Sequence, residues 1–186
     1  KTEEKGLNEK VSRGHNEGGK RMSVEGLLAV ARGEAEADLL LAGARVVDVF
    51  RGRVVEESVA VHGGKIAGIG ERRAKEMVDM GGEFLCPGFI DGHVHIESSM
   101  VSLPEYARAV VPSGTVAVVT DYHEIANVLG VEGLRYMMRA GEGLPLGVYV
   151  MLPSCVPATP METAGAVLEA EDLAPLLKEK AVMGLG

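Results

Sequence analysis

The sequence predicts an α/β protein in which a small β-rich segment precedes a region of alternating strands and helices. Residues 38–84 contain short apolar runs separated by glycine-bearing turns, which is typical of paired β-strands. After Pro87 the apolar runs alternate with longer amphipathic segments, and this alternation favours parallel strands covered by helices. A chain of 186 residues, 46% of them hydrophobic, can bury a core of this kind.

The N-terminal part of the chain divides into a charged tail and a β-rich segment. Residues 1–21 are charged and glycine-bearing without apolar periodicity, which predicts a disordered tail or an upstream extension with an exposed His15. Residues 22–86 are expected to form a short helix after Met22, followed by a small antiparallel β unit. His62 falls in one of the β-type runs, and we interpret it as an ordinary strand or turn residue.

Residues 87–186 are expected to form a second domain in which strands and helices alternate. Strands are predicted at 89–96, 115–121, 147–152 and 181–185. Helices are predicted at 103–111, 126–141 and 162–180. In parallel α/β architectures the functional groups lie at the carboxyl ends of the strands. We therefore expect the candidate site where these strands end.

The segment PGFIDGHVHIESSM at residues 87–100 places two histidines two residues apart at the end of an apolar run. Because side chains alternate along a strand, His93 and His95 point to one face. Asp91 and Glu97 add carboxylates to the same face, as candidates for binding substrate or for orienting the metal ligands. On a helix the two imidazoles would lie roughly 200° apart and could not share a ligand sphere. Two histidines that only form hydrogen bonds are the alternative, but the neighbouring carboxylates favour a metal site.

A second pair of ionisable residues, Asp121 and His123, follows the next strand with the same spacing. Both are further candidate metal ligands. The alternative is that Asp121 caps the following helix and that His123 hydrogen-bonds to it, and both interpretations stay open. Glu124 and Asn127 at the helix start are candidates for orienting the histidines around a cation, or for exposed capping.

The third strand leads into a proline-rich segment, MLPSCVPATP at residues 151–160. Proline fixes φ, so we expect a stiff loop that can wall a pocket, with Ser154 as a candidate substrate-binding residue. Cys155 would need a nearby base to act as a nucleophile, and a structural role is the favoured interpretation. Cys86 and Cys155 lack the spacing of a disulfide framework or a zinc knuckle, so a reducing cytoplasm is the expected location.

The net charge of −8 excludes some classes of partner. Nucleic acids and anionic membrane surfaces are themselves negative and would not attract this chain electrostatically. No apolar run in the sequence approaches the roughly 20 residues that span a bilayer. We therefore expect small molecules or other proteins as partners, with no nucleic acid and no membrane.

Three segments together resemble the adenine deaminases of the amidohydrolase superfamily: PGFIDGHVHIESSM, HEIANVLG and MLPSCVPATP. The pattern PG-x-ID-x-H-x-H is shared across the superfamily, whereas HIESSM, HEIANV and LPSCVPATP are more specific to the adenine enzymes. The resemblance runs from about Met22 to Gly186. One departure is Tyr122, where the family usually has proline, and it bears on the geometry of that loop.

The resemblance implies an α/β fold that is the N-terminal part of a (β/α)8 metal-dependent hydrolase barrel, about four strands of it, preceded by a small antiparallel β-sandwich segment. His93 and His95 are implied as ligands of a divalent metal, either manganese or iron, with zinc as an alternative. The implied reaction is the hydrolytic deamination of adenine to hypoxanthine and ammonia.

The resemblance also implies that part of the site lies outside this chain. In the family the motif Gly-Leu-Gly continues into a glutamate that bridges the metals, and an acid/base aspartate follows later, so both are expected beyond Gly186. We therefore expect the chain alone to be inactive or nearly so, and to form a homo-oligomer or pair with a complementary chain. The alternatives are a non-enzymatic or split subunit and another cyclic amidohydrolase such as a dihydroorotase.

Overall fold

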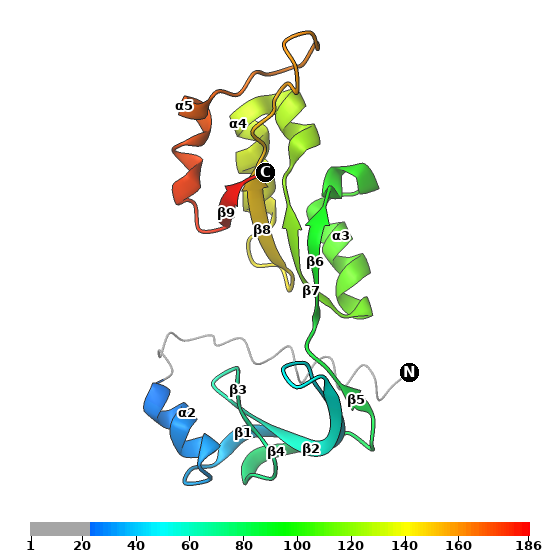
Figure 1. Cartoon of the computed structure of the whole chain (residues 1–186), viewed down its shortest axis with the longest axis vertical. Coiled ribbons are helices and arrows are strands. Elements are labelled where there is room, and N and C mark those ends of the chain that lie inside the picture. Colours follow the sequence, from blue (N-terminus) through cyan, green and yellow to red (C-terminus); the bar gives the residue numbers. More distant parts are fainter. Residues whose placement is uncertain (1–22) are drawn as a thin grey trace. The chain divides into compact units, whose positions relative to one another are not determined.

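The computed structural model describes residues 23–186, so the predicted tail at 1–21, with His15, lies outside the described residues. The chain divides into two compact units with the boundary between Pro87 and Gly88 (Figure 1). A Cβ at Gly88 would collide with the Val116 side chain. Glycine is therefore required where the chain enters the second unit.

The first unit begins with helix α2, Val24–Ala31, and Ser23 caps its N-terminus. The Ser23 Oγ accepts a hydrogen bond from the backbone N–H of Gly26 at 3.1 Å, which satisfies one of the free donors of the first turn. On the inner side of the helix, Val30 is fully buried in a small core with residues of the adjoining sheet. Packing of this one face therefore holds the short helix in place.

A five-stranded mixed sheet makes up the rest of the described first unit. Its strands are β1 (Ala37–Asp48), β2 (Arg53–His62), β3 (Lys65–Ile69), β4 (Ala74–Asp79) and β5 (Phe84–Leu85). The order is β3-β2-β1-β4, and β5 also pairs with β1. β2 pairs antiparallel with β1 and β3, whereas β4 and β5 lie parallel to β1. The expectation of an entirely antiparallel unit is therefore wrong.

Strand β4 shows why the sequence did not predict the parallel pairing in this sheet. Its sequence, AKEMVD, mixes charged and apolar residues, and most of its side chains are exposed at the edge of the sheet. No apolar run marks such a strand, so only its backbone pairing with β1 identifies it. The described strands of this unit form one sheet, and the β-sandwich stays a prediction.

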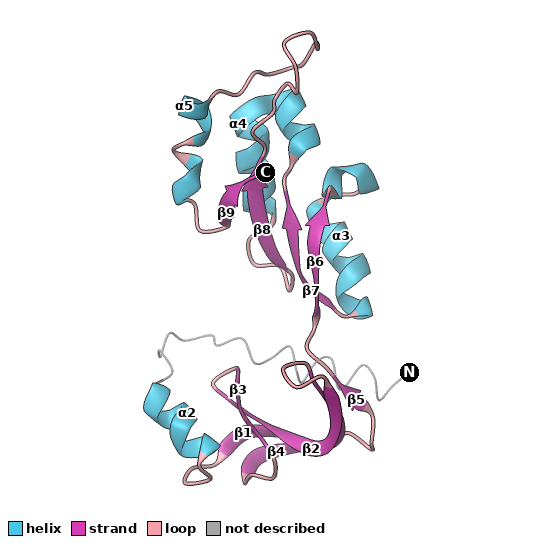
Figure 2. Ribbon diagram, in the orientation of Figure 1, coloured by secondary structure: helices cyan, strands magenta, loops and turns pink. Residues whose placement is uncertain are grey.

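The second unit is built on a four-stranded parallel sheet (Figure 2). Its strands are β6 (Phe89–Val94), β7 (Thr115–Thr120), β8 (Gly147–Leu152) and β9 (Val182–Leu185). They lie side by side in chain order, and each pair is parallel. The four predicted strands are confirmed with small differences at their ends.

Helical segments connect the strands of the second unit. They are η1 (Ile96–Ser99), α3 (Leu103–Val110), η2 (Val111–Ser113), α4 (His123–Ala140), α5 (Ala170–Leu173) and η3 (Leu176–Lys178). Their apolar sides pack against the sheet in one core, which contains Leu103, Val118, Leu134, Val150, Leu152 and Leu176. Within residues 23–186, every helix is too short or too polar to cross a membrane.

Helix α4 is interrupted in its middle. It begins at His123, earlier than predicted, and Gly130 within it has φ 59° and ψ −140°. A Cβ at Gly130 would lie 3.1 Å from the Cβ of Ala166, so glycine suits both the positive φ and the close approach of the later loop.

The predicted helix at 162–180 is wrong. Only the short α5 and η3 are helical there, and the segment 153–169 is irregular. The backbone N–H of Gly165 donates to the Asn127 carbonyl at 2.8 Å, and a Cβ at Gly165 would lie 2.6 Å from the Val128 carbonyl oxygen. Close docking of this segment on α4 therefore sets its path, against the apolar pattern that predicted a helix.

Candidate metal centre

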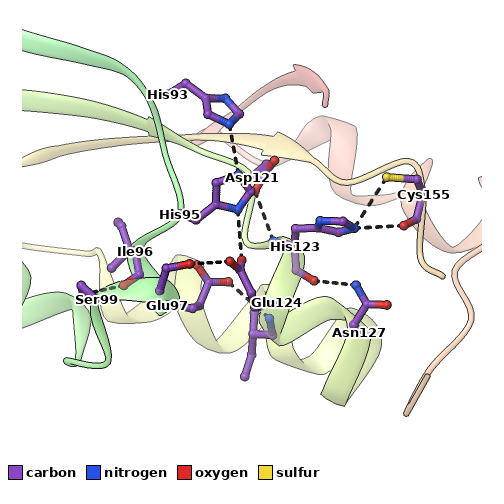
Figure 3. Close-up of polar contacts among 12 residues, drawn as sticks. His93, His95, Ile96, Glu97, Ser99, Asp121, His123, Glu124, Asn127 and Cys155 are labelled. Atoms are coloured by element: carbon purple, nitrogen blue, oxygen red, sulfur yellow. Dashed lines mark hydrogen bonds and ion pairs between the residues drawn. The ribbon is translucent and has the colours of Figure 1, made fainter. Parts of the chain in front are cut away.

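Three side chains with metal-binding atoms meet at the carboxyl ends of β6 and β7 (Figure 3). His93 lies in β6, His95 directly follows it, and Asp121 directly follows β7. One ligand atom of each residue lies within 4.8 Å of the other two, and residues 23–186 contain no other group of three with this spacing. This place agrees with the rule that functional groups lie at strand ends in parallel sheets.

The two histidines face each other through their Nε2 atoms, which lie 3.1 Å apart. Their ring centroids are 5.0 Å apart in an edge-on arrangement. One N–H donating to the other nitrogen would satisfy this pair. A cation would satisfy it as well, because nitrogens at this distance can both lie about 2.1 Å from one ion. Two imidazoles and one carboxylate fit a divalent transition metal.

Carboxylates hold His95 from the other side of its ring. Its Nδ1 lies 3.1 Å from Glu124 Oε2 and 3.2 Å from Asp121 Oδ1. The hydrogen bond to Glu124 raises the pKa of His95; burial opposes the rise, and the charges of Asp121 and Glu124 add to it. A proton kept on Nδ1 leaves the Nε2 lone pair available, as is typical of metal-binding histidines.

Asp121 combines the two roles that the sequence left as alternatives. Its Oδ1 accepts a hydrogen bond from the backbone N–H of His123 at 3.3 Å, at the start of α4. The same oxygen faces His95. The carboxylate can therefore cap the helix and contribute to a metal site together.

His123 lies near this group but outside it. Because α4 begins at His123, the strand alternation that predicted a shared face with Asp121 ends before it. Its Nε2 lies 3.0 Å from the Cys155 carbonyl oxygen and 3.6 Å from the Cys155 Sγ. The amide of Asn127 donates to the His123 carbonyl at 3.0 Å. The contacts of His123 with Cys155 tie the start of α4 to the proline-rich loop, and the Asn127 contact lies within α4.

Glu97 occupies a different position from the one predicted. Strand β6 ends at Val94, so Glu97 lies on η1 and does not share a strand face with the histidines. Its Oε1 accepts from the backbone N–H of Ile125 at 3.3 Å, and its Oε2 is buried without a hydrogen-bond partner. Burial raises the pKa of Glu97; its backbone hydrogen bonds oppose this, and the nearby carboxylates of Glu124 and Asp121 add to the rise.

The remaining predicted residues lie around the edges of the site. Asp91 Oδ1 accepts from the backbone N–H of His93 at 3.1 Å, so it shapes the end of β6. Ser154 does not join the group; its Oγ donates to the Gly186 carbonyl at 2.7 Å. Ser154 also lines an open pocket of about 470 Å³ with Val156 and Pro157 of the proline-rich loop.

Ser98 is a residue that the sequence prediction missed. Its Oγ donates to Glu124 Oε1 at 2.7 Å. The only sequence signal is the pair of serines within HIESSM, and nothing in that motif tells which serine faces α4.

A sequence profile described as the amidohydrolase family matches residues 84–184. The adenine deaminase of Dehalococcoides mccartyi is 53% identical over 161 residues, which cover 86% of this chain and 28% of that protein. The adenine deaminase of Desulfatibacillum aliphaticivorans is 54% identical over 159 residues, again covering 86% of this chain and 28% of the relative. The chain therefore spans about 28% of the length of these curated relatives.

Among solved structures, an N-acyl-D-glutamate deacylase from Bordetella bronchiseptica is similar with a TM-score of 0.48 and 21% identity, over 63% of this chain and 30% of that one. The family profile covers more than half of the chain and includes His93, His95 and Asp121. By this match the chain belongs to the amidohydrolase family.

Proposed function

We propose that this chain is the N-terminal part of an adenine deaminase and carries one side of a metal centre for the hydrolytic deamination of adenine to hypoxanthine and ammonia. The supporting observation is the group of His93, His95 and Asp121 at the strand ends, in a chain 53% identical to an adenine deaminase. The purine base is the proposed small-molecule partner, and the cytoplasm is the proposed location.

His93, His95 and Asp121 would hold the cation, the two histidines through Nε2. Bound there, a divalent cation would lower the pKa of a water molecule and so supply a nucleophile near neutral pH. Glu124 orients the His95 ring through its contact with Nδ1. We propose manganese or iron, with zinc as the alternative, because imidazole and carboxylate ligands suit all three metals.

The other predicted site residues have supporting roles in this proposal. Asp91 fixes the backbone that carries His93. Glu97 ties η1 to the first turn of α4. His123 is proposed to hold the proline-rich loop instead of a cation, since its Nε2 contacts the backbone of that loop. Ser154, which lines the neighbouring pocket, remains the candidate for contact with the substrate.

We propose three parts for the chain: a tail or upstream extension at 1–21, a helix and β-sandwich segment at 22–86, and the first half of a (β/α)8 barrel at 87–186. The relatives extend well beyond the part that this chain spans. Their additional residues are proposed to complete the barrel and to supply the bridging glutamate and the acid/base aspartate. The chain alone is therefore expected to have little or no activity.

A second candidate function is a subunit that works only with another chain. Exposed apolar side chains on the two edge strands of the second sheet favour it. Phe89 and Ile90 on β6 are 62% and 67% exposed, and Met183 and Leu185 on β9 are 64% and 52% exposed. Uncovered apolar edges of this kind favour association. The partner would be a second copy or a complementary chain.

The test is to purify the chain with Mn²⁺ and to measure both the metal bound per chain and the loss of adenine by ultraviolet absorbance. We expect Mn²⁺ binding that His93→Ala removes, no turnover by the chain alone, and turnover once the remaining part of the D. mccartyi enzyme is added. Binding that is absent, or unchanged in His93→Ala, would overturn the metal centre. Robust turnover by the chain alone would overturn the need for further residues.

Two additions to this experiment separate the alternatives. Dihydroorotate in place of adenine tests another cyclic amidohydrolase, because a pocket that hydrogen-bonds one ring rejects the other strongly. The molecular mass in solution tests the second candidate function: a monomer at working concentration, with no co-purifying chain, speaks against it.

A further inference from the structure

A hydroxyl group lies behind the carboxylate that holds His95. The Ser98 Oγ donates to Glu124 Oε1 at 2.7 Å, and the other oxygen of the same carboxylate lies 3.1 Å from His95 Nδ1. We propose that Ser98 is a positioning residue of the metal centre, whose hydroxyl keeps Glu124 in the orientation that leaves His95 Nε2 free for a cation. This inference rests on the proposed function.

Glu124 needs such a contact because its side chain is 43% exposed. An exposed glutamate loses conformational entropy when it is held in one orientation. A short hydrogen bond from a hydroxyl to a charged acceptor offsets this loss. With one oxygen held by Ser98, the second oxygen is directed at His95.

The contact decides which nitrogen of His95 carries the proton. A neutral imidazole has one N–H, and an ionised carboxylate can only accept, so Glu124 keeps that proton on Nδ1. The Nε2 lone pair then faces His93 Nε2 across 3.1 Å. With the proton on Nε2, the N–H would fill the space between the two histidines and exclude a cation.

Asp121 does not replace Glu124 in this role. Its Oδ1 also lies 3.2 Å from His95 Nδ1, but Asp121 belongs to the group of three that would bind the cation. A carboxylate engaged with a cation is a weaker acceptor for the ring N–H. We therefore assign the Nδ1 contact in the loaded site to Glu124. Because Asp121 also lies close to Nδ1, we expect removal of the Ser98 hydroxyl to lower the Nδ1–H share only in part.

The neighbouring serine provides a matched control. The Ser99 Oγ donates to the Ile96 carbonyl at 2.6 Å, within its own turn of η1, so its proton is not directed at Glu124. The turn itself is tied to α4 independently, because Glu97 accepts from the backbone N–H of Ile125. Removal of either hydroxyl should therefore leave η1 in place, and only the loss of Ser98 should release Glu124.

The experiment measures two properties of the full chain and its variants Ser98→Ala, Ser98→Thr, Ser99→Ala and Glu124→Gln. Mn²⁺ titration by calorimetry gives the affinity for the cation. Ring ¹⁵N chemical shifts of His95 in the metal-free protein, at a pH above the range where histidine titrates, give the share of the Nδ1–H form. Circular dichroism establishes that each variant is folded.

We expect Ser98→Ala to weaken Mn²⁺ binding by roughly 3- to 10-fold. This is less than the roughly 10- to 100-fold typical of a residue that hydrogen-bonds directly to a metal-binding side chain, because Ser98 acts through Glu124. The Nδ1–H share should fall in the same variant, Ser98→Thr should restore both properties, and Ser99→Ala should change neither. Glu124→Gln should weaken binding at least as much as Ser98→Ala.

Three results would overturn the role of Ser98. They are an unchanged Nδ1–H share in Ser98→Ala, a fall in that share without weaker Mn²⁺ binding, and an equal effect of Ser99→Ala. If Ser98→Ala does not fold, Glu124→Gln with an unchanged Nδ1–H share overturns it as well. Failure of the proposed function has a different signature, since wild-type chain would then bind no Mn²⁺ while the ring shifts still report on Ser98.

Discussion

Two clusters in this molecule place a histidine against a carboxylate, and they balance the negative charge in different ways. In the first unit, Asp38 Oδ2 lies 3.0 Å from His62 Nδ1 and accepts from the backbone N–H of Gly63, while Oδ1 lies 2.7 Å from Lys75 Nζ. Lys75 supplies the positive charge there, and both carboxylate oxygens of Asp38 have a partner.

The second cluster has no such cation of its own. His95 Nδ1 lies between Asp121 and Glu124, and within residues 23–186 no lysine or arginine forms an ion pair with either carboxylate. On the other side of the ring, Nε2 faces the Nε2 of His93. A carboxylate beside a histidine is thus neutralised by lysine in the first unit, whereas in the second unit two carboxylates and a second histidine surround His95 and leave a candidate cation site.

The largest difference expected between the two clusters is the gain in stability when a cation binds. Mn²⁺ at about 100 times its dissociation constant should raise the free energy of unfolding by about 2.7 kcal/mol. His95→Ala should abolish the gain, because a ligand nitrogen is lost, whereas His62→Ala should keep it. Urea unfolding with and without Mn²⁺ measures the difference. An equal gain in both variants would show that the two clusters are not distinct in this respect.

A smaller effect is expected from matched amide substitutions in metal-free protein. Asp38→Asn should lower the free energy of unfolding by about 1 kcal/mol, because the ion pair with Lys75 is lost. Asp121→Asn should leave it unchanged or raise it by a few tenths, since asparagine also caps a helix and the repulsion from Glu124 is reduced. Urea unfolding with a chelator at neutral pH tests this. A loss of equal size in both variants would contradict it.

The smallest effect is a pH dependence of opposite sign at the two clusters. Burial raises the pKa of Asp38, but the hydrogen bonds from Lys75 and Gly63 outweigh it, so that the pKa lies below the usual 3.8. This stabilisation is present above pH 3.8 and lost as the pH falls through the folded pKa. Glu124 raises the pKa of His95 above 6.5, so the stabilisation at His95 is present below pH 6.5 and lost as the pH rises through the folded pKa.

Urea unfolding of metal-free protein across the pH range measures this difference. Asp38→Asn should flatten only the acid limb of the stability profile, and His95→Ala only the limb above pH 6.5. Each change should be below about 1 kcal/mol, because both side chains are partly exposed and water screens their charges. An Asp38→Asn variant that flattens the alkaline limb instead would rule out this assignment.

The sequence was sufficient for the parts of the fold and the site that depend on local periodicity. Apolar runs predicted all four strands of the second unit, and the alternation along β6 predicted that His93 and His95 share a face. The strand did not extend far enough for Glu97 to share that face, because the chain turns into η1 directly after His95.

The contacts that complete the site depend on which elements meet in space. Glu124 reaches His95 from 29 positions away, and Ser98 reaches Glu124 from 26 positions away. The docking of Gly165 on α4 likewise prevents a helix that the apolar pattern alone favours. No periodicity encodes these distances, so only the folded arrangement reveals them.

The interruption at Gly130 divides α4 into two helical parts. The front turns carry Glu124 and contribute Ala126 to the core, while the rear turns contribute Leu134 and Met137 to the same core. Because the backbone at Gly130 is not helical, we expect a change in length or tilt behind it to be taken up mainly at this joint. Substitutions on the exposed side of the rear half are therefore expected to leave the geometry around His95 in place.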